Sequence, residues 1–273
     1  MNTNLGNITQ SSRRDRTNDA SYPKAAPRIV HELAPLRCMV HPGRRTTLRL
    51  LLGVLAGASL GVPDGAQAEA LTKDERDKLT PNQVIEMLKR GNERFRAGKM
   101  QAHDYLAQKR ATAGGQYPAA AILGCIDSRA PAEIIFDTAI GDTFNARIAG
   151  NIANDDLIGS LEFACAAAGA KVVLVMGHTA CGAVKGAIDN AELGHLTALL
   201  DKIKPAIPAT SFGGERTSKN ADFVDAVAAT NVRRTANDIR QRSSVLAGLE
   251  QEGKIKIVSS MYHLVGGQVE FLE

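Results

Sequence analysis

The stretch KVVLVMGHTACGAV, residues 171–184, decides the fold that this sequence predicts. Its first half is an unbroken apolar run, without the alternation of apolar and polar residues that is typical of a strand with one face in water. We therefore predict a strand that is buried on both faces. A helical pattern follows, and the turn between them holds His178 and Cys181. Strands of this kind belong to parallel sheets covered by helices.

Two further apolar runs, at residues 118–124 and 143–150, also predict strands. An alanine-rich helical pattern at residues 155–170 has the length of a crossover between parallel strands. Because strands alternate with helices, the sequence predicts an α/β fold with a mostly parallel sheet flanked by helices.

The two ends of this region add one element each. Residues 79–99 predict an N-terminal helical arm, in which Thr80 suits the cap and Pro81 the first helical position. Near the C-terminus, residues 254–263 and 268–272 alternate between apolar and polar residues on either side of a glycine pair. This pattern predicts a C-terminal antiparallel hairpin.

Residues 1–68 differ from the rest of the chain in charge and in pattern. They hold nine of the 33 Lys and Arg residues but only four of the 29 Asp and Glu residues. The remainder is therefore almost neutral and lacks the excess of basic residues that is typical of a nucleic-acid-binding protein. Residues 39–68 run from Arg44-Arg45 through a short apolar stretch to Ala66-Gln67-Ala68, the order of a twin-arginine export signal.

We therefore expect a periplasmic or otherwise exported protein, with a signal at residues 39–68 and one catalytic domain at residues 69–273. After cleavage of the signal, no membrane attachment is expected. A membrane anchor is the alternative, but the apolar stretch is short and contains glycine. Residues 1–38 are predicted to be a disordered extension, and translation could instead begin at Met39.

The number of cysteines favours chemistry over a disulfide framework. Of the four cysteines, Cys38 falls in the leader, which leaves an odd number for an exported domain. Cys165 lies on the helical pattern, so we predict that it is a core residue. Cys125 and Cys181 are then left for another role.

Two predicted strands end in metal-binding residue types. Cys125 directly follows the run at residues 118–124, and His178 and Cys181 follow the run at residues 170–177. Ligands gather beyond the carboxyl ends of parallel strands, so we expect these side chains to converge. Two thiolates and one imidazole suit tetrahedral zinc with one open position, as in catalytic sites. Taken singly, each residue would indicate only a core or loop position; together, at matching strand ends, they favour a metal site.

Asp127 and Arg129 follow the first of these residues closely. A carboxylate two positions after a metal-bound thiolate can fill the fourth metal position itself, or accept a hydrogen bond from metal-bound hydroxide. Arg129 can pair with this carboxylate and hold it off the metal. An isolated Asp-Ser-Arg would indicate only a helix cap and a solvated arginine. Next to Cys125, it predicts a catalytic pair.

The motifs CIDSR (125–129) and GHTACG (177–182) resemble those of the beta class of carbonic anhydrases, and the likeness runs from about residue 72 to the C-terminus. The resemblance implies one Zn²⁺ per subunit and a gating dyad formed by Asp127 and Arg129. It implies that the zinc ligands are Cys125, His178 and Cys181, with Asp127 as a further candidate. Four more segments support the likeness: MLKRGNERFRAGK (87–99), GDTFNARIAGN (141–151), GSLEFA (159–164) and GQVEFL (267–272).

The same resemblance implies a homodimer or tetramer with each pocket at a subunit boundary. Gln116 has the spacing of a glutamine that contacts substrate, and Phe144 corresponds to a phenylalanine of the pocket. Phe163 stands where the family has a tyrosine, so we expect it in the pocket without the hydroxyl group. His263 replaces the aspartate of the family's Y-D-L segment.

These features predict a carbonic anhydrase (carbonate dehydratase, a zinc lyase), which reversibly hydrates carbon dioxide to bicarbonate and a proton through zinc-bound hydroxide. His103 and His195 are the candidates for carrying the proton away. One alternative is a hydrolase of carbonyl sulfide or carbon disulfide on the same zinc site. Another is a zinc- or bicarbonate-binding protein without turnover. A thiol redox protein is disfavoured, because Cys125 and Cys181 do not form a Cys-x-x-Cys motif.

Overall fold

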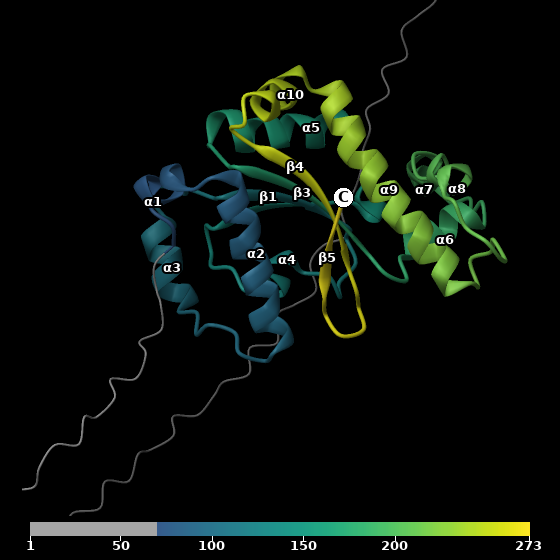
Figure 1. The fold of residues 1–273 in the computed structure, drawn as a ribbon, viewed down its shortest axis with the longest axis horizontal. Helices are drawn as coiled ribbons and strands as arrows, with labels where there is room; N and C mark the ends of the chain where they lie inside the picture. Colours follow the sequence, from purple (N-terminus) through teal and green to yellow (C-terminus); the bar gives the residue numbers. More distant parts are fainter. Residues whose placement is uncertain (1–69) are drawn as a thin grey trace, which may run out of the picture. The chain divides into compact units, whose positions relative to one another are not determined.

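The computed structural model describes residues 70–273, so the predicted extension and export signal lie outside the described residues. The described part contains a five-stranded sheet with the strand order β2-β1-β3-β4-β5 (Figure 1). Within residues 70–273, no helix is both long and apolar enough to cross a membrane. The strands are β1 (Ala120–Gly124), β2 (Thr143–Arg147), β3 (Val172–His178), β4 (Lys256–Tyr262) and β5 (Val269–Leu272).

The sheet is mostly parallel. The pairs β1–β2, β1–β3 and β3–β4 are parallel, whereas β4 and β5 form an antiparallel hairpin at the C-terminus. The predicted sheet and its terminal hairpin are therefore confirmed. Gly124 of β1 pairs with Met176 of β3, so the carboxyl ends of these two strands lie next to each other.

Helices cover both faces of the sheet. All seven residues of β3 are buried, as the apolar run predicted. Val173 and Val175 pack in the core that α9 covers, whereas Val172 and Leu174 pack in the core that α2 covers. The helices of the described part are α1 (Lys73–Lys78), α2 (Pro81–Arg96), α3 (Tyr105–Thr112), α4 (Ala132–Ile135), α5 (Asp155–Glu162), α6 (Gly182–Ile188), α7 (Gly194–Asp201), α8 (Ala206–Ala209), α9 (Ala221–Arg242) and α10 (Ser244–Gln251).

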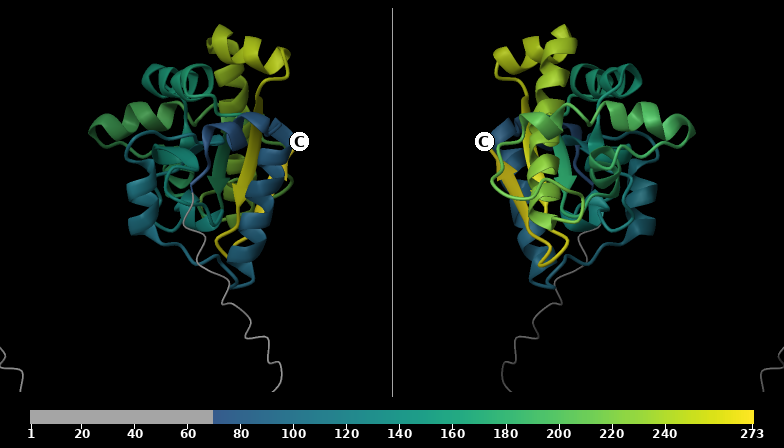
Figure 2. Two further views of the ribbon diagram at one scale, coloured as in Figure 1. Left: turned by 90° about the vertical axis from the view of Figure 1, so that its left-hand side faces the viewer. Right: turned by 90° about the vertical axis from the view of Figure 1, so that its right-hand side faces the viewer.

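The predicted N-terminal helix begins where the sequence indicated. The Thr80 side chain caps α2, and Pro81 occupies its first turn. Farther along the helix, Asn92 donates a hydrogen bond to the carbonyl of Gly267 and accepts one from the backbone N–H of Val269. These bonds fasten α2 to the C-terminal hairpin, and Figure 2 shows the two elements side by side.

The predicted crossover helix ends in an unusual turn. Helix α5 continues into a π-helical turn, η2 (Phe163–Ala167), which carries Cys165. Cys165 is buried in the core, and burial raises the pKa of its thiol to about 12. A thiol in such surroundings is inert, which agrees with the prediction that Cys165 is a core residue.

Candidate metal centre

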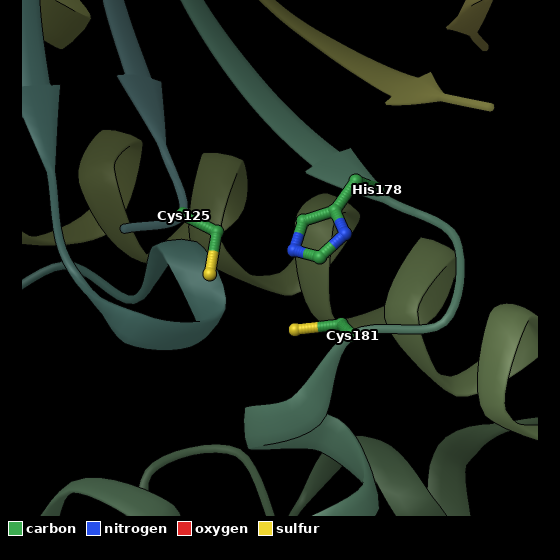
Figure 3. A group of neighbouring side chains, drawn as sticks. All are labelled: Cys125, His178 and Cys181. Atoms are coloured by element: carbon green, nitrogen blue, oxygen red, sulfur yellow. The ribbon is translucent and has the colours of Figure 1, made fainter. Parts of the chain in front are cut away.

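Three side chains converge where β1 and β3 end. Cys125 follows the last residue of β1, His178 is the last residue of β3, and Cys181 immediately precedes α6. Their ligand atoms all lie within 4.8 Å of one another, and all three residues are buried. Figure 3 shows the two sulfur atoms and the imidazole ring pointing into a common space. The convergence predicted from the two strand ends is therefore present.

The hydrogen bonds of His178 leave one ring nitrogen for a metal. Its Nδ1 lies 2.9 Å from the carbonyl oxygen of Thr179, which makes Nδ1 the donor and leaves the lone pair on Nε2. Nε2 is buried and finds no hydrogen-bond partner among residues 70–273. A buried polar atom without a partner is costly, and a cation between Nε2 and the two sulfur atoms would satisfy it.

The two thiols interact, and their pKa values shift in opposite directions. The hydrogen bond from Cys181, with smaller contributions from His178 and the Gly150 backbone, lowers the pKa of Cys125 to about 4 despite its burial. The same bond and burial raise the pKa of Cys181. Burial lowers the pKa of His178, but the neighbouring Cys125 sulfur raises it, and the net shift is upward. Two sulfur atoms and one imidazole nitrogen that converge in this way fit Zn²⁺, with the fourth tetrahedral position left for solvent or Asp127.

Asp127 faces this group but is held by Arg129. The guanidinium donates from Nε to Oδ1 at 2.9 Å and from Nη2 to Oδ2 at 2.7 Å, and the backbone N–H of Arg129 donates to Oδ1 at 2.9 Å. Oδ2 lies 3.8 Å from Nε2 of His178. Hydrogen bonds from Arg129 hold the pKa of Asp127 well below its usual range, so the carboxylate is an acceptor only.

Arg147 and Gly150 also shape the site, although the sequence analysis assigned neither of them a separate role. Arg147 donates from Nε to the carbonyl of Cys125 at 2.9 Å and from Nη2 to the carbonyl of Asp127. The backbone N–H of Gly150 donates to the sulfur of Cys125 at 3.4 Å. Both residues belong to the GDTFNARIAGN segment, which was the available signal. Their contacts involve backbone atoms, and residue types alone do not report these.

The predicted substrate residues lie away from this cluster within one chain. Gln116 precedes β1, at the opposite end of that strand from Cys125. Phe144 on β2 pairs with Ala121, four positions before Cys125, which corresponds to about 13 Å along a strand. Phe144 and Phe163 contact each other edge to face, with ring centroids 6.3 Å apart. The hollow that they line includes none of the three residues of the cluster.

The remaining histidines named from the sequence are also separate from the cluster. His103 lies 2.9 Å from Asp137 through Nε2 and 3.2 Å from Gln108 through Nδ1, so both its nitrogens are engaged. His195 is exposed on α7. His263 lies between β4 and β5, with Nε2 3.2 Å from Glu270.

Comparisons with known proteins agree with this site. A family model described as "Carbonic anhydrase" matches residues 120–269. A carbonic anhydrase of Mycolicibacterium smegmatis is 34% identical over 189 residues, which cover 67% of this chain and 89% of that protein. Carbonic anhydrase 2 of Mycobacterium tuberculosis is 35% identical over 184 residues, covering 66% of this chain and 87% of that protein.

Solved structures show the same fold at lower identity. The beta-carbonic anhydrase CafA of Aspergillus fumigatus has a TM-score of 0.54 and 24% identity, and the match covers 70% of this chain and 89% of that one. A tetrameric beta-carbonic anhydrase of Sordaria macrospora has a TM-score of 0.54 and 23% identity, and the match covers 70% of this chain and 97% of that one. The chain therefore belongs to the carbonic anhydrase family, and its fold is that of the beta class.

Proposed function

We propose that this protein is a zinc-dependent carbonic anhydrase that reversibly hydrates carbon dioxide to bicarbonate. The observation that carries this proposal is the buried Cys125–His178–Cys181 cluster with the unpartnered Nε2 atom, next to a carboxylate that an arginine holds in place. A zinc ion bound there would acidify a water molecule at its open position, which supplies hydroxide near neutral pH.

In this mechanism Asp127 orients the attacking oxygen. Because the carboxylate is ionised and can only accept, it would accept a hydrogen bond from the O–H of the hydroxide and so direct the oxygen lone pair at carbon dioxide. Arg129 occupies both carboxylate oxygens and so keeps Asp127 from rotating toward the zinc ligands. Arg147 fixes the backbone between Cys125 and Asp127, which sets where the carboxylate points.

The pocket for carbon dioxide requires a second copy of the chain. Gln116, Phe144 and Phe163 do not reach the zinc ligands of their own chain, and we propose that they serve the site of a partner in a homodimer or tetramer. The exposed apolar side chains support such an interface: Phe163 is 60% exposed, and Ile126, adjacent to Cys125, is 61% exposed. The related Sordaria macrospora enzyme is tetrameric.

We also propose that the chain is exported through its twin-arginine signal and acts in the periplasm or outside the cell. The support is the order of Arg44-Arg45, the apolar stretch and Ala66-Gln67-Ala68. Replacing both arginines by lysine is expected to leave the unprocessed protein inside the cell. Processing and normal fractionation of that variant would contradict the proposal.

Metal analysis and a stopped-flow carbon dioxide assay test the proposed reaction. We expect one zinc per chain and rapid hydration, both lost in Cys181→Ala. Cys165→Ala is the matched control, because it removes a buried thiol that lies outside the cluster. Carbonyl sulfide and carbon disulfide should be assayed side by side with carbon dioxide. Faster turnover of a sulfur substrate, or zinc binding without any turnover, would overturn the proposal.

A further inference from the structure

We infer that helix α9 holds the two halves of the metal centre at a fixed separation, and that Asp225 and Asn231 are the positioning residues. This inference rests on the proposed zinc site. One half is Cys125 with the loop that donates to its sulfur, and the other is the turn from His178 to Cys181. The two halves come from different parts of the chain, and α9 bonds to both of them.

The first contact controls the loop beside Cys125. Asn231 is only 3% exposed, and its side-chain amide donates to the carbonyl of Gly150 at 2.8 Å. The backbone N–H of Gly150 in turn donates to the Cys125 sulfur. Asn231 therefore fixes the position of Gly150, whose backbone N–H reaches one of the proposed zinc ligands. A hydrogen bond to a thiolate ligand orients it and reduces its donation to the metal.

The conformation of this loop explains why it needs an anchor. Gly150 has a φ of 66°, in the left-handed region, and a Cβ atom there would lie 2.4 Å from Cδ1 of Ile203. Asn151, the next residue, also has a positive φ, of 43°. Gly150 adopts this region without a steric cost, whereas Asn151 does so less readily, so the bond from helix α9 helps to hold the Gly150 N–H on the sulfur.

The second contact controls the turn that carries the other two ligands. Asp225 accepts a hydrogen bond from the backbone N–H of Ala180 at 2.7 Å. Ala180 lies between His178 and Cys181 and has a φ of 55°, which is strained for a residue with a Cβ atom. The carboxylate of Asp225 thus stabilises the backbone conformation that brings the two ligands to the same side of the turn.

Helix α9 is suited to link these contacts. It is 22 residues long, packs along β3 and β4, and also contacts α6 and the turn η1 (Ala149–Asn151). Figure 1 shows α9 extending past the sheet toward α6. Asp225 and Asn231 are six residues apart, which corresponds to about 9 Å along the helix axis. A rigid helix with both contacts therefore sets the separation between the Cys125 loop and the His178–Cys181 turn.

The test measures zinc affinity by chelator competition, together with the absorption spectrum of the cobalt-substituted protein. Loss of such supporting bonds typically weakens metal binding about 10- to 100-fold. We expect that loss in Asn231→Asp, which keeps the shape but removes the donor, and in Asp225→Ala. Asp225→Asn retains an acceptor oxygen and should bind zinc nearly as the wild type does. The thiolate-to-cobalt charge-transfer band should shift in Asn231→Asp.

Two control variants on α9 separate positioning from general stability. Asp222→Ala removes an exposed carboxylate from the first turn, and Ile239→Val trims a buried side chain two turns beyond Asn231. Both should keep the wild-type zinc affinity and cobalt spectrum, even where the melting temperature falls. If Asn231→Asp does not fold, Asn231→Ala replaces it, and the Asp225 pair tests the second contact independently.

The possible failures are distinguishable. If the wild-type protein binds no zinc, the proposed function fails together with this inference. If the wild type binds zinc but Asn231→Asp and Asp225→Ala have its affinity and spectrum, only the role of α9 is refuted. Equal losses in Asp222→Ala or Ile239→Val would also refute it, because the effect would then follow from destabilisation of the helix.

Discussion

Replacing Arg129 by alanine is the sharpest test of the proposed mechanism. The substitution removes both guanidinium bonds to Asp127 and leaves only the bond from the backbone N–H of residue 129 to Oδ1. Oδ2 is then free to move, and it starts 3.8 Å from Nε2 of His178. Adjacent ligand atoms of a tetrahedral zinc shell, with bonds of 2.0–2.2 Å, lie about 3.4 Å apart. The separation of Oδ2 from Nε2 thus exceeds that of two zinc-bound atoms by only about 0.4 Å.

We expect Arg129→Ala to keep one zinc per chain but to lose about 100-fold in kcat/KM for carbon dioxide. Stopped-flow hydration measures the rate, and metal analysis measures the zinc. The double variant Asp127→Ala/Arg129→Ala cannot close the metal shell, so it should be more active than Arg129→Ala alone. Full activity in Arg129→Ala would remove the pair from the mechanism. A double variant that is no more active would show that blocking by Asp127 is not the cause.

Three further predictions concern the metal, the assembly and the buried acid Asp137. Chelation should abolish hydration and lower the melting temperature, because an ion that binds only the folded state adds about 4 kcal/mol at 1,000 times its Kd; unchanged melting would contradict a folded-state zinc site. Mixing Gln116→Ala and Asp127→Ala chains should restore about a quarter of the sites of a randomly exchanging dimer, whereas pockets built within one chain would gain nothing. Burial raises the pKa of Asp137. Hydrogen bonds from Arg94, His103 and the Gln101 backbone lower this pKa by more than burial raises it, so the net pKa is below the usual value. Its stabilising contribution is thus present above about pH 4 and is lost as the pH falls through the lowered folded pKa. Asp137→Asn should cost roughly 3 kcal/mol at pH 7 and flatten the acid side of the stability profile, measured by urea unfolding from pH 2 to 7; an unchanged slope there would refute the assignment.

The strands and helices that carry the site could be predicted from local sequence. The unbroken apolar run of β3 can be buried on both faces only in a covered sheet, and its end necessarily delivers His178 to the edge where β1 delivers Cys125. The capping residues of α2 were likewise recognisable, because a cap depends on neighbours within one turn.

Other parts of the site depend on contacts that a linear pattern does not encode. Arg147, Asp225 and Asn231 all act on backbone groups, which every residue type presents alike. No spacing rule links Asn231 to Gly150, which is 81 positions away. The register of β2 against β1 places Phe144 away from the metal cluster, and Phe163 packs against it from the turn after α5; side-chain identity alone did not specify either.

By itself, the sequence determined the chemistry of this protein: two thiols, an imidazole and an arginine-paired carboxylate, each next to the end of a buried strand or the start of a helix. The tertiary structure decided the arrangement in which that chemistry can operate. It brought three ligand atoms within 4.8 Å, assigned the lone pair to Nε2 of His178 and placed α9 across both loops. The physical reason is that residue types and short-range spacing govern reactivity and local hydrogen bonding, whereas ligand geometry depends on backbone contacts between segments far apart in the chain.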